Sequence, residues 1–386
     1  MQLKFLVPAK FYNKTFLQFQ PFNPYYMKTK NYLNLGLILA VLFSMSIMGC
    51  QKETEKIQPT SDNGQINSGL KATATGLIVT AGTIVNGTYK PGVVLTTANT
   101  VTLKVTVTAI GTYNIVTSAV NGYSFSKSGS FTATGTQLIT LAGAGTPAAT
   151  GLNTFTVTFG TTASFAVVVV SPDPIVMSSC GTGYTYYEVA NHATQKVWLD
   201  RNLGATRVGT AANDYLSYGS LYQWGRLADN HQCITWASAI FGTPVNGVTT
   251  VTSSTNTPAN ALFVKTMASP WDWRVPQNNS LWQGVSGINN PCPAGFRVPT
   301  SAEFIAEIAT WTTKNPAGAF GSSLKWVEAG YRDFPDGQIY GPGSEGDYWS
   351  STASSTKATI MYFSSVGAYT ADDYRAAAFS VRCIKN

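Results

Sequence analysis

Apolar and polar residues alternate along several segments between residues 72 and 171. Residues 101–107 (VTLKVTV) place an apolar side chain at every second position, which is the period of a β-strand with one buried face. Comparable segments follow, separated by Gly, Asn and Thr residues typical of turns; they lie at 113–116, 122–126, 137–141, 155–159 and 164–170. About seven strands in about 100 residues predict an all-β sandwich over residues 72–172.

The hydrophobic pattern becomes irregular after the stiff Pro-Asp-Pro linker at 172–174. Thr300 followed by Glu303 makes a capping box, which marks the start of a helix. Residues at helical spacing come next and are predicted to form its apolar face: Ala302, Phe304, Ile305, Ile308 and Trp311. Short β segments recur from 324 to 383, whereas residues 240–270 lack periodicity and are predicted to form a long surface excursion.

The first 71 residues contain a predicted export signal. A basic segment at 28–30 is followed by an apolar run at 33–48, which is the order of a bacterial secretory signal. The run is slightly short for a membrane span, so a retained transmembrane helix is the weaker interpretation. Residues 1–26 do not fit a signal peptide, and we therefore predict a start at Met27 and a spurious extension before it.

Residues 47–50 (IMGC) resemble a lipobox, where lipoprotein signal peptidase cleaves and the new N-terminal cysteine is acylated. The resemblance implies a signal peptide at 27–49, lipidation of Cys50 and anchoring to a membrane through acyl chains. Residues 51–55 are similar to the surface-export tag of Bacteroidetes lipoproteins. We therefore expect an outer membrane lipoprotein exposed on the cell surface, with the periplasmic face as second choice. Residues 50–71, polar and without aromatic residues, are predicted to be a flexible tether.

Composition and charge agree with export. Only 11% of the residues are charged, while Gly, Ser, Thr and aromatic residues are plentiful, which suits a turn-rich extracellular protein. The net charge of +7 divides into +5 over residues 1–71, +3 over 72–172 and −1 over 173–386. Because no cluster of Arg and Lys stands out, nucleic acid is not an expected partner.

Four cysteines remain if Cys50 is lipidated, and all of them lie in the last 214 residues. An even number in an exported domain indicates disulfides, with three possible pairings. Cys292 and Cys383 both lie beside an arginine, and we expect these two parts of the chain to meet and to pair. This leaves Cys180 with Cys233. A zinc site is the alternative, although the chain has two histidines and no Cys-x-x-Cys pair.

Six motifs of the C-terminal part occur in an order that resembles the Fibrobacter succinogenes major paralogous domain, over residues 178–386. They are WLDRNL at 198–203, YQWGR at 222–226, CPAGFRVPT at 292–300, GYR at 330–332, YWSS at 348–351 and SVRC at 380–383. The resemblance implies an exported bacterial protein, often a lipoprotein. It also implies an irregular α+β domain over 173–386, related to the C-type-lectin-like and formylglycine-generating-enzyme group.

The chain is therefore predicted to be multidomain, with an all-β immunoglobulin-like sandwich before the irregular α+β domain. Residues 72–172 are similar to the immunoglobulin-like repeats of flavobacterial surface proteins. Because residues 72–171 hold no Asp, Glu, His or Cys, we interpret them as a spacer.

A ligand site is predicted around the aromatic residues of the loops at 213–283. A carbohydrate site needs exposed rings, for the apolar C–H faces of the sugar, beside side chains that hydrogen-bond its hydroxyls. The residues that offer both are Tyr222, Trp224, Trp271, Asp272, Trp273 and Arg274. The calcium-binding motifs of the related lectins do not occur, so no metal or cofactor is expected. An unrelated oxygen-ligand loop is the alternative, built from Asp333, Asp336, Glu345 and Asp347.

Several other residues are predicted to be structural. Arg297 and Arg382 lie between apolar neighbours, where their five fixed donors would satisfy loop carbonyls or an internal carboxylate. Trp349 is expected in a buried strand. Glu303 is explained by the capping box, and its neighbour Glu307, one turn away, is expected to face solvent.

These features predict a surface-anchored lipoprotein with a non-catalytic recognition domain that binds an extracellular glycan or protein. Enzymatic signatures such as Gly-x-Ser-x-Gly, His-Glu-x-x-His or a phosphate loop do not occur. Formylglycine-generating enzymes use a reactive cysteine pair near the C-terminus, where this chain has Cys383 alone. The alternatives are an enzyme on that fold or a purely structural component of the envelope.

Overall fold

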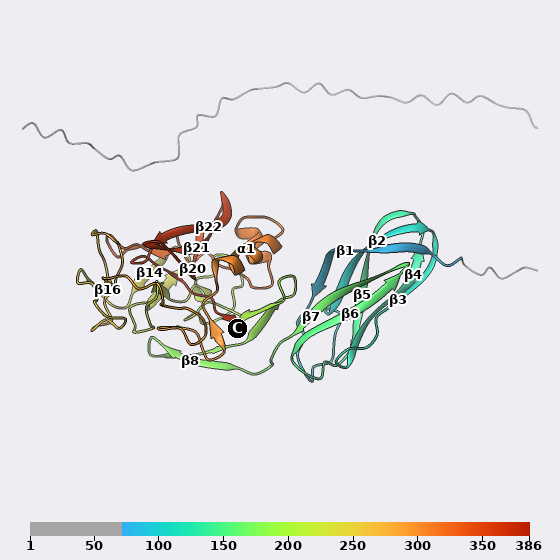
Figure 1. Cartoon of the computed structure of the whole chain (residues 1–386), viewed down its shortest axis with the longest axis horizontal. Helices are drawn as coiled ribbons and strands as arrows, with labels where there is room; N and C mark the ends of the chain where they lie inside the picture. Colours follow the sequence, from blue (N-terminus) through green and yellow to red (C-terminus); the bar gives the residue numbers. More distant parts are fainter. Residues whose placement is uncertain (1–71) are drawn as a thin grey trace, which may run out of the picture. The chain divides into compact units, whose positions relative to one another are not determined.

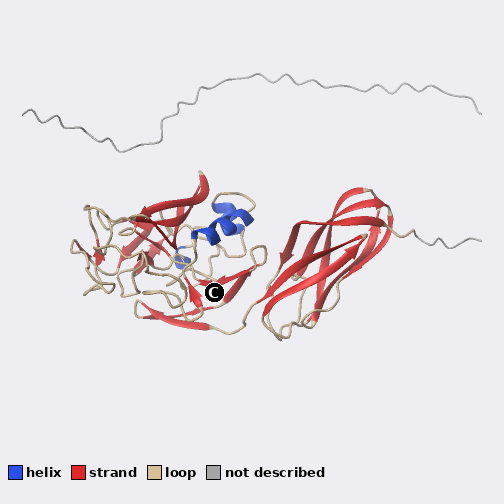
Figure 2. Ribbon diagram, viewed as in Figure 1, coloured by secondary structure: helices blue, strands red, loops and turns tan. Residues whose placement is uncertain are grey.

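The computed structural model describes residues 72–386, and the predicted signal peptide, Cys50 and tether lie outside these residues. The described part falls in one compact unit. It consists mostly of β-strands in several antiparallel sheets, with two short α-helices in residues 72–386 (Figure 1, Figure 2). Within that part, no helix has the length and apolar character that a membrane crossing requires.

Residues 75–169 form seven strands, the number that the sequence pattern predicts. Five strands make one antiparallel sheet in the order β1-β2-β5-β4-β3, and β6 and β7 form an antiparallel hairpin. Their bounds are β1 Thr75–Asn86, β2 Thr100–Ala109, β3 Gly111–Val116, β4 Tyr123–Phe131, β5 Gly135–Gly145, β6 Gly151–Phe159 and β7 Thr161–Val169. The sheet and the hairpin share one core, in which Val101, Phe155 and Phe165 are buried. This arrangement is consistent with an all-β sandwich.

The C-terminal part begins with the hairpin of β8 and β9 and then forms a four-stranded sheet in the order β10-β11-β24-β17. The bounds are β8 Ile175–Ser179, β9 Thr182–Tyr186, β10 Glu188–Asn191, β11 Lys196–Leu199, β17 Phe296–Arg297 and β24 Ile384–Lys385. Strand β24 pairs with β11 through Trp198 and Ile384, and with β17 through Arg297 and Ile384. The end of the domain therefore meets both its start and its middle, as the sequence predicts.

A larger sheet follows the order β19-β18-β23-β20-β21-β22, and β12 adds to it by pairing with β23. The bounds are β12 Leu221–Gln223, β18 Tyr331–Arg332, β19 Ile339–Tyr340, β20 Glu345–Ser354, β21 Lys357–Ser364, β22 Gly367–Tyr374 and β23 Ala378–Ser380. Successive residues of a strand point to opposite faces of the sheet, so each face of this sheet packs against a different part of the domain. One face, with Tyr348, Met361 and Phe363, packs against helix α1 (Ser301–Thr310).

The region predicted as a long surface excursion contains three short strands. They are β14 Phe241–Pro244, which pairs with β13 Ile234–Ser238, and the parallel pair β15 Val248–Thr249 and β16 Phe263–Val264. The prediction that 240–270 lies entirely on the surface is wrong at β16, because Phe263 and Val264 are buried. Two residues are too few to produce a recognisable period in the sequence.

Helix α1 begins as predicted. The hydroxyl of Thr300 accepts from the Glu303 amide, and the Glu303 carboxylate accepts from the Thr300 amide, which completes the capping box. Three details of the prediction are wrong: Ala302 is exposed, Ile305 is 57% exposed, and Glu307 is fully buried. The other helical segments are η1 Tyr215–Ser217 and α2 Pro316–Gly321, which has Asn315 as its N-cap.

The buried Glu307 carboxylate joins helix α1 to the start of the domain. It accepts from the indole N–H groups of Trp311 (3.1 Å) and Trp326 (3.0 Å) and from the amide of Asn191 (2.6 Å). Buried polar groups are tolerated when all their hydrogen bonds are made. These donors come from distant segments, which explains why helical spacing alone places Glu307 wrongly.

Candidate ligand-binding site

Both predicted disulfides are present. Cys292 pairs with Cys383, with their Cα atoms 5.8 Å apart, and Cys180 pairs with Cys233 at 5.7 Å. The zinc alternative is therefore wrong, because all four thiols are used in covalent bonds. The Cys292–Cys383 bond fixes the loop before β17 to the residue before β24.

Arg297 has the structural role that the sequence predicts. Its guanidinium donates to both carboxylate oxygens of Glu303, at 2.8 and 2.7 Å. Burial alone would raise the pKa of Glu303, but the hydrogen bonds from Arg297 and Thr300 hold this pKa at about 2. A carboxylate bound in this way fixes the N-terminus of α1 to Arg297 of β17. The Cys292–Thr300 block therefore has a structural role.

Arg382 and Trp349 are structural as well. Arg382 is 1% exposed, donates twice to the Asn202 side-chain oxygen (3.0 and 2.9 Å) and once to the Leu324 carbonyl (2.8 Å). Its guanidinium also lies 5.0 Å from the centre of the Trp326 ring. Trp349 is fully buried, and its indole N–H donates to the Tyr222 carbonyl. Neither side chain has surface for a ligand.

Most of the predicted aromatic site is core. Tyr222, Trp224 and Trp273 are at most 1% exposed, and Asp272 is 3% exposed. The Trp273 indole donates to the Trp224 carbonyl (2.7 Å), and the Trp224 indole to the Ser350 carbonyl (2.9 Å). These four side chains cannot contact a sugar while they pack inside the domain, so this part of the predicted site is not supported. Trp271 and Arg274 keep exposed surface.

Sequence reasoning missed a set of exposed aromatic side chains on the large sheet, on the face opposite helix α1. Tyr331 pairs with Tyr340 across β18 and β19, and Tyr362 pairs with Tyr369 across β21 and β22. The ring centres lie 5.9 Å apart in the first pair and 5.1 Å apart in the second. Tyr340 is 43% and Tyr369 50% exposed, while the inner two are partly buried. We call these four residues the tyrosine row.

Asp347 lies between the two halves of the row. It pairs directly with Tyr362, and a bridge between Gly330 and Gly346 brings Tyr331 alongside it from the other direction. The Asp347 side chain is 4% exposed, and its Oδ2 atom has no hydrogen-bond partner in the described residues. Burial, together with the charges of Glu345 and Asp373, raises the pKa of Asp347 well above its usual range.

Four carboxyl groups gather in this region: Asp333, Glu345, Asp347 and Asp373, which we call the acidic quartet. Burial is the main cause that raises the pKa of each carboxyl group. At Asp373, the negative charge of Asp333 raises the pKa further. Within residues 72–386, no member lies within ion-pair distance of a Lys, Arg or His. The quartet is thus a group of partly or fully buried carboxyls without an ion pair in the described chain, although the charge of Lys357 acts to lower the pKa of Asp373.

The predicted residue Trp271 lies close to other aromatic rings. Its ring lies 4.8 Å from that of Tyr374, which in turn lies 5.5 Å from Phe334. Phe334 and Tyr374 follow Asp333 and Asp373 in the chain. The oxygen-ligand loop considered from the sequence is not supported, since no group of three or more His, Cys, Asp or Glu in residues 72–386 has an arrangement suited to a metal.

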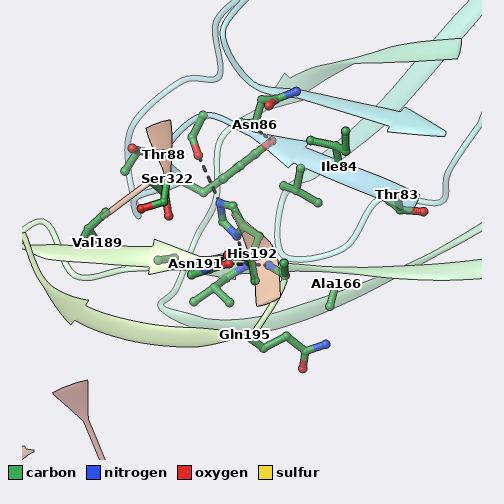
Figure 3. A pocket seen from close by; sticks show the side chains of 18 of the residues that line it. Thr83, Ile84, Asn86, Thr88, Ala166, Val189, Asn191, His192, Gln195 and Ser322 are labelled. Carbon is green, nitrogen blue, oxygen red and sulfur yellow. Dashed lines mark hydrogen bonds between the residues drawn. The ribbon is translucent and has the colours of Figure 1, made fainter. Parts of the chain in front are cut away.

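Two concave sites lie elsewhere. The larger, of about 760 Å³, is lined by residues from the β-sandwich and from 189–195 and 310–325 (Figure 3). His192 occupies its middle, where Nδ1 accepts from the Val168 amide (3.1 Å) and Nε2 lies 3.2 Å from the Gly87 carbonyl. Burial lowers the pKa of His192, and both ring nitrogens are used, so this histidine joins segments of the chain. The smaller site, of about 490 Å³, is lined by Tyr184, Tyr187, Arg201 and several threonines.

In comparisons with known proteins, no family model, curated protein or solved structure matches the chain. The resemblance to the Fibrobacter succinogenes major paralogous domain therefore stays a prediction.

Proposed function

We propose that this protein is a surface-anchored lipoprotein whose C-terminal domain binds an extracellular glycan without catalysis. The observation that carries the proposal is the tyrosine row, which places two pairs of aromatic rings on one sheet, one pair on β18 and β19 and the other on β21 and β22. In this proposal the β-sandwich is an immunoglobulin-like spacer, and residues 173–386 are an irregular α+β domain of the C-type-lectin-like kind. The spacer lifts the row away from the membrane.

The tyrosine row suits a linear sugar chain for a physical reason. Neighbouring strands in a sheet lie about 4.8 Å apart, so each tyrosine pair spans two adjacent strands, and the two pairs are separated by β23 and β20. A sugar presents an apolar C–H face to such rings, and its hydroxyls bond to carboxylates and phenols beside them. Because the strands hold the rings in place before the ligand arrives, little conformational freedom is lost on binding.

The histidine and cysteine side chains are engaged in other contacts in the described part of the chain. Both histidines use their two ring nitrogens, since His231 Nδ1 bonds to Asp229 (2.6 Å) and Nε2 accepts from the Gln223 amide (3.0 Å). His231 is also fully buried. The four described cysteines are in disulfides. This engagement supports a binding role over an enzymatic one.

A glycan array tests the proposal. We expect the purified full-length chain to bind a set of linear glycans, and the double substitution Tyr340→Ala and Tyr369→Ala to weaken binding about 10-fold or more, since aromatic contact residues often contribute about 1–2 kcal/mol each. Both side chains are exposed, so the double variant should stay folded.

Tyr187→Ala is the matched control. Tyr187 is 38% exposed and lines the smaller concave site, so its loss should leave binding unchanged. If Tyr187→Ala loses binding while the Tyr340→Ala and Tyr369→Ala double variant keeps it, the glycan binds at the smaller concave site and not at the tyrosine row. If no glycan on the array binds, the glycan proposal is wrong; binding to envelope proteins instead would favour the protein-ligand alternative.

The proposed anchor has its own test. Cys50→Ser removes the only thiol in the lipobox-like segment, and we expect the variant to leave the membrane fraction while the wild type stays in it. Protease treatment of intact cells distinguishes the surface from the periplasmic face, because only a surface-exposed chain is digested. A Cys50→Ser variant that still sediments with membranes would show that another segment anchors the protein.

A further inference from the structure

We infer that the tyrosine row and the acidic quartet together select a glycan that carries free amino groups. In this inference, which rests on the proposed function, the sugar rings lie on the tyrosines and a ligand ammonium group binds at the quartet. The result is a site for an amino-sugar chain with unacylated amines.

The first argument is the unused hydrogen-bonding capacity of Asp347. Its side chain is 96% buried, as its 4% exposure implies, and Oδ2 has no hydrogen-bond partner among residues 72–386. Buried polar atoms in folded proteins are nearly always bonded, because an unbonded one costs free energy. Glu345 and Asp373 keep some exposed surface, so a ligand donor can reach the quartet from outside.

The second argument is a contrast with the ion-paired carboxylates of the domain. Glu303 pairs with Arg297 (2.7 Å), Asp214 with Arg207 (2.9 Å) and Asp229 with Arg226 (2.8 Å). The quartet makes no such pair within the described residues, although its members are at least partly buried. A partly buried charge normally has a partner, and a cationic ligand would complement this site.

The chemistry of the site favours an ammonium over a metal ion. Metal sites need several ligands at fixed distances around one point, and no group of three or more His, Cys, Asp or Glu is placed that way in residues 72–386. An ammonium group instead offers three donors to separate oxygens and is attracted to the faces of aromatic rings. Tyr331 and Tyr362, on either side of Asp347, supply such faces.

The arrangement of the row favours a sugar chain over a lysine side chain. Two tyrosines lie on each side of Asp347, so the aromatic surface continues well past the charged centre in both directions. A lysine side chain would use the centre alone and leave Tyr340 and Tyr369 without a role. A chain of sugar rings contacts the whole row.

Calorimetric titration of the full-length chain tests this inference with two probes that differ only in acylation. These are oligosaccharides of glucosamine and oligosaccharides of N-acetylglucosamine with the same length and linkage. We expect the amine form to bind about 10-fold to 100-fold tighter, the ratio for a hydrogen-bonded charge pair of about 1.5–3 kcal/mol. Asp347→Asn should abolish this preference, and Glu345→Gln should reduce it.

We expect these variants to fold, since Asp347→Asn replaces a buried carboxyl with a neutral amide and keeps the shape of the side chain. Asp372→Asn is the control: Asp372 is exposed and is next to Asp373 but points to the opposite face of β22, so the preference should persist. Thermal unfolding of all three variants checks that each is folded.

The outcomes separate this inference from the proposed function. Equal binding of the amine and N-acetyl forms overturns the amine selectivity and leaves glycan binding intact. Absence of binding to either form, with binding to other glycans on the array, overturns the selectivity as well, and no binding to any glycan overturns both. Tighter binding of lysine oligomers than of glucosamine oligomers would show that the site recognises a basic peptide.

Discussion

Replacing both Cys292 and Cys383 with serine is expected to lower the free energy of unfolding by about 3–5 kcal/mol. The bond joins residues 91 positions apart, and closing a loop of that length restricts the unfolded chain by about 4–5 kcal/mol in the chain-entropy account. Cys383 is fully buried beside β24, so the paired strands β17, β24 and β11 must then be held by packing and hydrogen bonds alone.

Urea denaturation under non-reducing conditions measures this loss. The comparison is the double variant Cys180→Ser and Cys233→Ser, whose bond spans 53 positions. Loop length alone predicts that this second variant loses about 0.5 kcal/mol less than the first. A change below about 1 kcal/mol for the Cys292–Cys383 pair would mean that the strand pairing closes the domain unaided and that the disulfide is dispensable for its stability.

Replacing Arg382 with methionine is expected to cost about 3–5 kcal/mol, because it removes every donor to two buried acceptors. Methionine approximates the length of the side chain but leaves the Asn202 oxygen and the Leu324 carbonyl unbonded. The effect extends further, since the Asn202 amide donates to the Tyr218 carbonyl (3.0 Å) and to the Tyr348 hydroxyl (3.1 Å).

Arg382→Lys is the informative second variant. Burial lowers the pKa of Arg382, which shows that the site disfavours a charge unless it is fully hydrogen-bonded. A lysine is a compact point charge without the planar fork that reaches both acceptors, so it should recover little of the lost stability. Arg297→Met, at a site where the arginine is 14% exposed, should cost less. An Arg382→Lys protein as stable as the wild type, judged by urea denaturation, would contradict this account.

Sequence reasoning succeeded where the signal is local or covalent. The capping box of Thr300 and Glu303 is readable because both partners lie within one turn. The strands of the β-sandwich are readable because apolar residues alternate over many positions, as at 101–107. The pairing of Cys292 with Cys383 followed from matched neighbours, which place an arginine near each cysteine.

Sequence reasoning failed where a side chain's surroundings come from distant segments. Trp271 and Trp273 are two positions apart in a loop without periodicity, and only the fold shows that the first has exposed surface and the second has none. The tyrosine row is likewise invisible in the sequence, because its members come from four strands whose register depends on pairing across the sheet. The acidic quartet has the same origin, so three of its members cannot be told from solvated loop acids before the strands are placed.

The position of β24 sets the order in which the domain can fold. This strand lies between β11 and β17, and its partner Trp198 precedes Ile384 by nearly the whole length of the domain. Contacts over such separations form late, after the cost of closing a long loop has been met. A chain stalled or cleaved anywhere before Cys383 would therefore expose the edges of β11 and β17 and the thiol of Cys292. Unpaired strand edges and a free thiol promote aggregation and proteolysis. We therefore expect an incomplete chain to aggregate or to be degraded more readily than the complete domain.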